Sequence, residues 1–108
     1  MAKAEDKPLF LDVLAFWCVW CYRMDYYTYP DAEVAELLNT KFIPVKIVQE
    51  QDTAGDYSKI MGILGARGIP AMGIWNPEGE LLSYISGWKK PEDFVQALTD
   101  AVATPEED

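Results

Sequence analysis

The stretch Phe16-Trp17-Cys18-Val19-Trp20-Cys21 decides the fold of this chain, because it holds both cysteines, three positions apart. It ends a nearly continuous apolar run at residues 9–16, a pattern typical of a strand buried on both faces of a sheet with parallel neighbours. A cysteine that opens a helix after such a strand has a lowered pKa, because the helix dipole and backbone N–H groups favour the thiolate. A second cysteine one helical turn later can attack a mixed disulfide formed at the first. We therefore predict that Cys18 is the nucleophile and Cys21 the resolving thiol of a redox pair.

The composition limits the domain number and the partners. The chain has 108 residues, half of them hydrophobic, which suits one domain with a single core. No apolar run approaches the roughly 20 residues of a membrane span. The net charge is −9, and the nine Lys and Arg residues form no basic run that could neutralise phosphates, so nucleic acid is not an expected partner. We expect a flexible N-terminus at residues 1–7, a folded domain at 8–103 and an acidic tail at 104–108.

Two cysteines without any histidine favour redox chemistry over a structural or metal site. A pair this close restricts the unfolded chain very little, so it is a poor structural staple. A zinc site usually takes four Cys or His ligands, which this chain could supply only with a second chain. We expect no metal, no cofactor and a monomer. The charged N-terminus is not a signal peptide, so the compartment is either the cytoplasm or, with a targeting segment removed, the bacterial periplasm.

The remaining patterns predict an α/β fold with a mixed sheet of about four strands in the order β-α-β-α-β-β-α. Pro30 ends the first helix and Asp31 caps a second helical segment. Thr53 is the expected N-cap of the next helix and Gly65 its C-cap. Pro91 suits the first position of the last helix. The expected strands are 9–16, 42–48, 71–75 and 81–86, and the expected helices run from 18 to 29, from 31, from 53 to Gly65 and from 91.

Asp12 stands out within the first predicted strand. It is the only polar residue in an apolar run and lies six residues before Cys18. A carboxylate buried in a sheet has a raised pKa, because burial disfavours its charged form. Asp12 is therefore a candidate functional residue.

These residues resemble the thioredoxin superfamily over roughly residues 8–103. Trp17-Cys18-x-x-Cys21 after a buried strand is similar to its active site, Asp12 stands where thioredoxins carry a buried carboxylate, and Arg67-Gly68-Ile69-Pro70 resembles the segment with their cis-proline. Asp31-Ala32-Glu33-Val34 and Phe42-Ile43-Pro44-Val45-Lys46 look most like the C-terminal domain of DsbD-type membrane disulfide reductases. Two departures are the Val19-Trp20 dipeptide, where thioredoxin has Gly-Pro, and the lack of room for thioredoxin's additional N-terminal strand and helix.

The resemblance implies roles for several further residues. Asp12 would accept the proton of Cys21, directly or through water, and Lys46 would neighbour Asp12 across the sheet and favour its carboxylate form. A cis bond at Pro70 would carry the backbone of Ile69 past the sulfurs, where it could pair with an extended substrate segment. Two tryptophans flank Cys18. Trp17 is expected to contact a partner, and Trp20 could either contact a partner or pack on its own domain.

Three functions remain open from the sequence. The first is a thiol–disulfide oxidoreductase that reduces disulfide-containing proteins and is itself reduced by a thiol electron donor. The alternative is a redox-inactive module that uses the thioredoxin scaffold to bind a client. The third is a metal carrier with both thiolates at a dimer interface, which the absence of histidine disfavours. The family resemblance favours the reductase.

Overall fold

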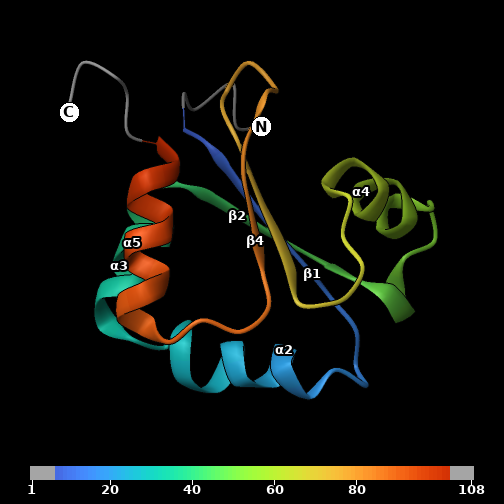
Figure 1. Cartoon of the computed structure of the whole chain (residues 1–108), viewed down its shortest axis with the longest axis horizontal. Coiled ribbons are helices and arrows are strands. Elements are labelled where there is room, and N and C mark those ends of the chain that lie inside the picture. The colour runs from blue at the N-terminus through green and yellow to red at the C-terminus, as the bar shows by residue number, and fades with distance from the viewer. Residues whose placement is uncertain (1–6, 103–108) are drawn as a thin grey trace.

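The computed structural model describes residues 7–102, in which a four-stranded mixed sheet is covered by helices (Figure 1). The sheet order is β2-β1-β3-β4. Strand β1 (Leu9–Leu14) pairs in parallel with β2 (Ile43–Val48) and antiparallel with β3 (Ala71–Trp75). Strand β4 (Leu81–Ser86) pairs antiparallel with β3 and completes the hairpin. The predicted mixed sheet and its strand order along the chain are confirmed.

The helices lie on both faces and at one end of the sheet. Helices α3 and α5 cover one face and α4 the other, while α2 and η1 run across the end where β1 leads into the cysteines (Figure 1). A short 3₁₀ turn, η2, follows β2. The bounds are α2 Val19–Arg23, η1 Met24–Thr28, α3 Ala32–Lys41, η2 Gln49–Gln51, α4 Asp56–Leu64 and α5 Pro91–Val102.

The first predicted helix is α-helical only as far as Arg23 and continues as the π-helical segment η1. The wider turn is closed by the backbone N–H of Tyr29, which donates to the carbonyl of Met24 at 2.8 Å. It leaves Met24 and Thr28 fully buried, and the Thr28 hydroxyl donates to the carbonyl of Lys89. The π-helical geometry, which the sequence periodicity did not predict, thus occurs together with tertiary contacts to the loop before α5.

The main core lies between the sheet and the helices α3 and α5. Phe10 of β1 meets the ring of Phe94 of α5 edge to face, with the ring centroids 5.6 Å apart, and Tyr29 packs against both rings. Residues Leu11 and Val13, which alternate with Phe10 along β1, pack on the opposite face against α4. This alternation places Asp12 on the same face as Phe10.

The predicted cap of α4 is wrong. The N-cap is Gly55, in a left-handed conformation, rather than Thr53. The carboxylate of Asp52 accepts hydrogen bonds from the backbone N–H groups of Asp56, at 3.1 Å, and Tyr57, at 3.0 Å. One carboxylate therefore satisfies two donors of the first turn, and the helix begins later than expected.

The predicted terminal segments lie almost entirely outside the described residues. Of residues 1–7 only Lys7 is described, and residue 103 and the tail 104–108 fall beyond the last described position. Within residues 7–102, no helix combines the length and the apolar character that crossing a membrane requires.

Candidate functional site

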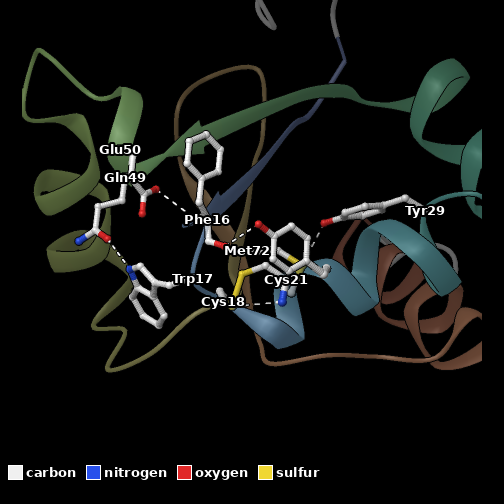
Figure 2. The surroundings of a disulfide bond; sticks show 9 residues. Phe16, Trp17, Cys18, Cys21, Tyr29, Gln49, Glu50 and Met72 are labelled. Atoms are coloured by element: carbon white, nitrogen blue, oxygen red, sulfur yellow. Dashed lines mark hydrogen bonds between the residues drawn. A yellow bond between two sulfur atoms is a disulfide. The ribbon is translucent and has the colours of Figure 1, made fainter.

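The two cysteines are joined as a disulfide where β1 leads into α2. The backbone N–H of Cys18 donates to the carbonyl of Ala15 at 3.1 Å, which turns the chain after the strand. Cys18 is the N-cap of α2, and its sulfur accepts a hydrogen bond of 3.1 Å from the backbone N–H of Cys21 (Figure 2). The sulfur therefore occupies the place of a capping oxygen at the positive end of the helix, where a negative charge is stabilised. This arrangement favours the thiolate of Cys18 once the disulfide is reduced.

Side chains of η2 and of α2 hold the loop before Cys18 (Figure 2). The carboxylate of Glu50 accepts from the backbone N–H of Phe16 at 2.9 Å, and the indole N–H of Trp17 donates to the side-chain carbonyl of Gln49 at 3.0 Å. The hydroxyl of Tyr22 donates to the carbonyl of Phe16 at 2.5 Å. Three side chains thus hold the two residues that precede the nucleophile. Gln49 and Glu50 could not be recognised from the sequence, because no local pattern marks a partner more than 30 residues away, and Tyr22, six residues from Phe16, carries no motif that marks this contact.

Both cysteines are nearly buried, with exposed fractions of 3% for Cys18 and 4% for Cys21. Leu14 completes their cluster, and Val48 and Ile69 pack against it. The Ile69–Pro70 peptide bond is cis, and the carbonyl of Pro70 accepts from the backbone N–H of Gly87 at 2.9 Å. The structure therefore brings the predicted substrate-binding residue Ile69 against the predicted catalytic cysteines.

The two tryptophans beside the nucleophile differ in their surroundings. Trp17 has an exposed fraction of 65% and touches η2 through its indole N–H. Trp20 is half exposed, lies at a centroid distance of 6.4 Å from the ring of Trp88, and has the guanidinium of Arg23 4.9 Å from its ring centroid. Trp20 thus packs on its own domain with one side and faces solvent with the other. Trp88 follows the left-handed Gly87 and was not identified from the sequence.

Asp12 is buried, with an exposed fraction of 3%, and one carboxylate oxygen has no hydrogen-bond partner. Burial raises its pKa from 3.8 to about 6, while the nearby hydroxyl of Tyr29 and the charge of Lys46 partly oppose the rise and the carboxylate of Asp25 adds to it. No hydrogen bond joins Asp12 to either cysteine within the described part of the chain. The expected raised pKa is present, and the role in proton transfer stays a prediction.

Lys46 lies directly opposite Asp12 in the register of β1 and β2. Its ammonium group forms an ion pair of 2.7 Å with Asp25 of η1. Asp12, Asp25, Tyr29 and Lys46 all line a cavity of about 600 Å³ between the sheet, η1 and α3. The cavity is large enough for water to reach the buried carboxylate.

Among residues 7–102, no group of three or more His, Cys, Asp and Glu side chains is arranged to hold a metal ion. The two cysteines are occupied by their mutual bond. With its own atoms the site can make and break this bond.

Comparison with known sequences identifies the family. The family Thioredox_DsbH, described as "Protein of unknown function, DUF255", matches residues 1–98. The chain belongs to this family. The chain is also similar to the mouse protein "Spermatogenesis-associated protein 20", with 33% identity over 95 residues. It is similar to "Thiol:disulfide interchange protein DsbD" of Vibrio cholerae, with 29% identity over 101 residues. These alignments cover 85% and 91% of the chain but only 12% and 16% of the two relatives.

Solved structures agree with this assignment. The C-terminal domain of Neisseria meningitidis DsbD in its oxidised form superposes with a TM-score of 0.71 at 23% identity, over 89% of this chain and 81% of that domain. A thioredoxin from Thermus thermophilus superposes with a TM-score of 0.78 at 18% identity, over 92% of this chain and 76% of that protein. The DsbH/DUF255 chain therefore has the thioredoxin fold, and the expected resemblance to the DsbD C-terminal domain is confirmed.

Proposed function

We propose that this DsbH/DUF255 domain is a thiol–disulfide oxidoreductase that reduces disulfides of partner proteins. The observation that carries the proposal is the Cys18–Cys21 disulfide at the start of α2, with the sulfur of Cys18 accepting a backbone hydrogen bond at the positive end of the helix. The similarity to proteins called thiol:disulfide interchange proteins supports it.

The reaction begins with the reduced domain. The thiolate of Cys18 attacks one sulfur of the partner's disulfide, and the other partner sulfur leaves as a thiolate. Cys21 loses its proton and attacks the sulfur of Cys18, which releases the partner as a dithiol and restores the Cys18–Cys21 disulfide. Two electrons move to the partner, and a thiol electron donor must return two electrons to the domain. In this proposal Asp12 accepts the proton of Cys21 through water, and Trp17, Ile69 and Pro70 contact the partner.

The cysteine variants separate the two roles. Cys18→Ala should abolish reduction of a protein disulfide such as that of insulin, because the attacking thiolate is gone. Cys21→Ala should accumulate a mixed disulfide between Cys18 and the substrate, detectable as an added mass that dithiothreitol removes. Tyr26→Ala, on the exposed surface of η1, is the control that should react as the unmodified protein does. Full activity of the Cys18→Ala variant would refute the proposal, whereas an unmodified domain that reduces no disulfide would favour a redox-inactive binding module.

The direction of the reaction is tested by the equilibrium reduction potential of the pair. We expect a value near that of thioredoxin, about −270 mV, which suits a reductant. A value near that of a strong oxidant, about −120 mV, would reverse the proposed direction while leaving the exchange chemistry intact.

A further inference from the structure

The two edges of the sheet differ in their chemistry. Among residues 7–102, β2 and β4 form these edges, since β1 and β3 each have two strand neighbours. Strand β2 carries Pro44, which has no N–H to offer a further strand, and the exposed Lys46. Proline and lysine on an edge strand both oppose the addition of another strand. Strand β4, with the sequence Leu-Leu-Ser-Tyr-Ile-Ser, has neither a proline nor a charge. The β4 edge therefore lacks the protection that the β2 edge has.

The outer edge of β4 has backbone groups that a further strand could bond. The N–H of Gly87 donates to the carbonyl just before β3 at 2.9 Å, which continues the β3–β4 ladder. In an antiparallel ladder, residues that bond to the neighbouring strand alternate with residues whose N–H and C=O point away from it. Gly87 and Ile85 face β3, so the backbone groups of Tyr84 and Ser86 point outward. Within the described part of the chain no strand pairs with them, and the carbonyl of Ser86 accepts only from the side chain of Lys89, at 3.2 Å.

The side chains along this edge are apolar and partly exposed. Leu81, Leu82 and Tyr84 have exposed fractions of 40%, 42% and 37%. A groove of about 420 Å³ is lined by residues 82–86 of β4 and by one face of α5. Exposed apolar surface beside free backbone groups favours the addition of an extended strand. The β4 edge therefore has the properties of an interaction surface.

Charged residues of opposite sign stand at the two ends of this uncharged strand. Glu78 and Glu80 precede β4, and Lys89 and Lys90 follow it. Antiparallel pairing of two copies of β4 would place the acidic end of each strand beside the basic end of the other. Parallel pairing would instead place like charges together. Because opposite charges across an interface favour association and fix its orientation, the pattern selects a second copy of the same strand as the occupant.

Most of the surface opposes contact between two copies, because the chain carries a net charge of −9. The segment from Glu78 to Lys90 differs, since its acidic and basic side chains balance. Within residues 7–102 only one of its charged side chains forms an ion pair, that of Lys90 with Glu92 at 3.6 Å on the exposed surface. The other charges of the segment therefore remain available to a second copy.

We propose that two copies of this domain associate by antiparallel pairing of their β4 strands, centred on Tyr84, so that their sheets join into one. The N–H and C=O of each Tyr84 would bond to the Tyr84 of the other copy, and Glu80 of each copy would lie near Lys89 of the other. The interface is two-fold symmetric, so each of these contacts occurs twice. This inference goes beyond the exchange reaction, and it differs from the monomer expected from the sequence.

The proposed pairing keeps the two disulfides apart. Strand β4 runs in the same direction as β1, because both pair antiparallel with β3. The disulfide follows the end of β1, so antiparallel pairing places the two disulfides at opposite ends of the joined sheet. Each disulfide would react without the other. Association and disulfide exchange can therefore be tested separately.

Sedimentation velocity of the oxidised domain measures the association. Both cysteines are then held in their mutual bond, so no disulfide between copies can form. A strand edge of this length buries less area than a standard interface of about 1,600 Å², so we expect a reversible dimer with a Kd of about 10 to 100 µM. The mean mass should rise from one copy toward two as the concentration passes through this range. A mass of one copy at about 1 mM would overturn the proposal.

Substitutions on the edge assign the association to β4. Tyr84→Lys should weaken the dimer by about tenfold or more, because it places two like charges opposite each other at the two-fold axis. Leu82→Lys makes the same test at a second position, and circular dichroism verifies that each variant is folded. The matched control is Ile63→Lys, which also replaces an exposed apolar side chain, here on α4 with an exposed fraction of 55%, and should leave the Kd unchanged. A dimer that neither β4 variant weakens would overturn the proposal.

Two charge reversals test the antiparallel orientation. Glu80→Lys and Lys89→Glu should each weaken the dimer by about tenfold at low ionic strength, because each turns two attractive contacts into repulsive ones. An equimolar mixture of the two variants should associate as tightly as the unmodified domain, since a mixed pair again has opposite charges at both ends. Failure of the mixture to associate more tightly than either variant alone would overturn the proposed orientation and with it the proposal.

Reduction of insulin separates this inference from the proposed function. The Tyr84→Lys variant should reduce insulin at the rate of the unmodified domain, because Tyr84 lies outside the disulfide site. A domain that dimerises through β4 but reduces no disulfide would support the dimer and overturn the oxidoreductase. A domain that reduces insulin and has the mass of one copy at every concentration would do the reverse.

Discussion

Replacing Asp12 by Asn should stabilise the oxidised domain at neutral pH. The carboxylate has an exposed fraction of 3%, one of its oxygens has no partner, and its pKa is raised from 3.8 to about 6. A pKa difference of this size between the unfolded and folded states corresponds to about 3 kcal/mol of unfolding free energy. Asn has nearly the same shape and no charge, so it removes the free-energy cost of burying a charged carboxylate. Its amide still requires hydrogen bonds in the cavity beside Tyr29, which makes 3 kcal/mol an upper value.

The pH dependence gives the sign of the effect. Below about pH 3.8 the carboxyl is protonated in both states and contributes no cost. Between about pH 3.8 and pH 6 the folded state holds the proton more tightly than the unfolded state, so this group lowers the stability as the pH rises. Above about pH 6 the full cost is present. The advantage of Asp12→Asn should therefore grow across this window and then stay constant.

The assay is urea unfolding of the oxidised protein between about pH 4 and pH 7.5, followed by tryptophan fluorescence. The quantity that matters is the difference in unfolding free energy between the variant and the unmodified domain, because the titration of all other carboxyls largely cancels in it. Most of the 3 kcal/mol should appear as a change in this difference. Glu78→Gln, in the exposed turn of the hairpin, should show no such change. A difference that is constant with pH for Asp12→Asn would refute the raised pKa.

Two other predictions concern packing and the loop before the nucleophile. Gly73→Ala should destabilise the domain by about 1 to 3 kcal/mol, because a Cβ there would lie 2.5 Å from the ring of Trp75. Gly62→Ala, where the added Cβ has no atom within 4 Å, should stabilise it by about 0.5 to 1 kcal/mol. Thermal or urea unfolding measures both changes. Glu50→Gln should lower the pKa of the Cys18 thiol in the reduced domain, because it removes a negative charge that binds the loop two residues away. The ultraviolet absorbance of the thiolate, measured as a function of pH, gives this pKa. An unchanged or higher pKa would contradict the prediction.

The parts of the fold that follow local rules could be predicted from the sequence. Strand β3 lies at the expected residues 71–75, and α5 begins at Pro91. Asp31 caps α3, where its carboxylate accepts from the backbone N–H of Val34 at 3.2 Å. In each case the deciding interaction lies within a few residues, or the residue has one strongly preferred conformation. Asp12 is also buried as expected, because a single carboxylate in an apolar strand must share the burial of its neighbours.

The parts that depend on distant residues could not be predicted. The π-helical geometry of η1 goes with contacts to the loop before α5, and the hydrogen bond from Trp17 to Gln49 joins residues 32 positions apart. The predicted start of α4 was wrong because the carboxylate of Asp52, three residues before Gly55, accepts the backbone hydrogen bonds that Thr53 was expected to accept. The rings of Trp20 and Trp88 lie close together, although no periodicity in the sequence relates these two residues.

The sulfur of Cys18 caps a helix and also changes its covalent partner in each exchange. Folding and electron transfer therefore form a closed thermodynamic cycle. The difference in unfolding free energy between the oxidised and reduced domain must equal the difference in reduction potential between the folded and unfolded chain, where about 30 mV corresponds to 1.4 kcal/mol. A substitution in α2 that stabilises both redox states equally leaves the potential unchanged. A substitution makes the domain a stronger or weaker reductant only if it stabilises one redox state more than the other, and a change to the capping hydrogen bond is one direct way to do so.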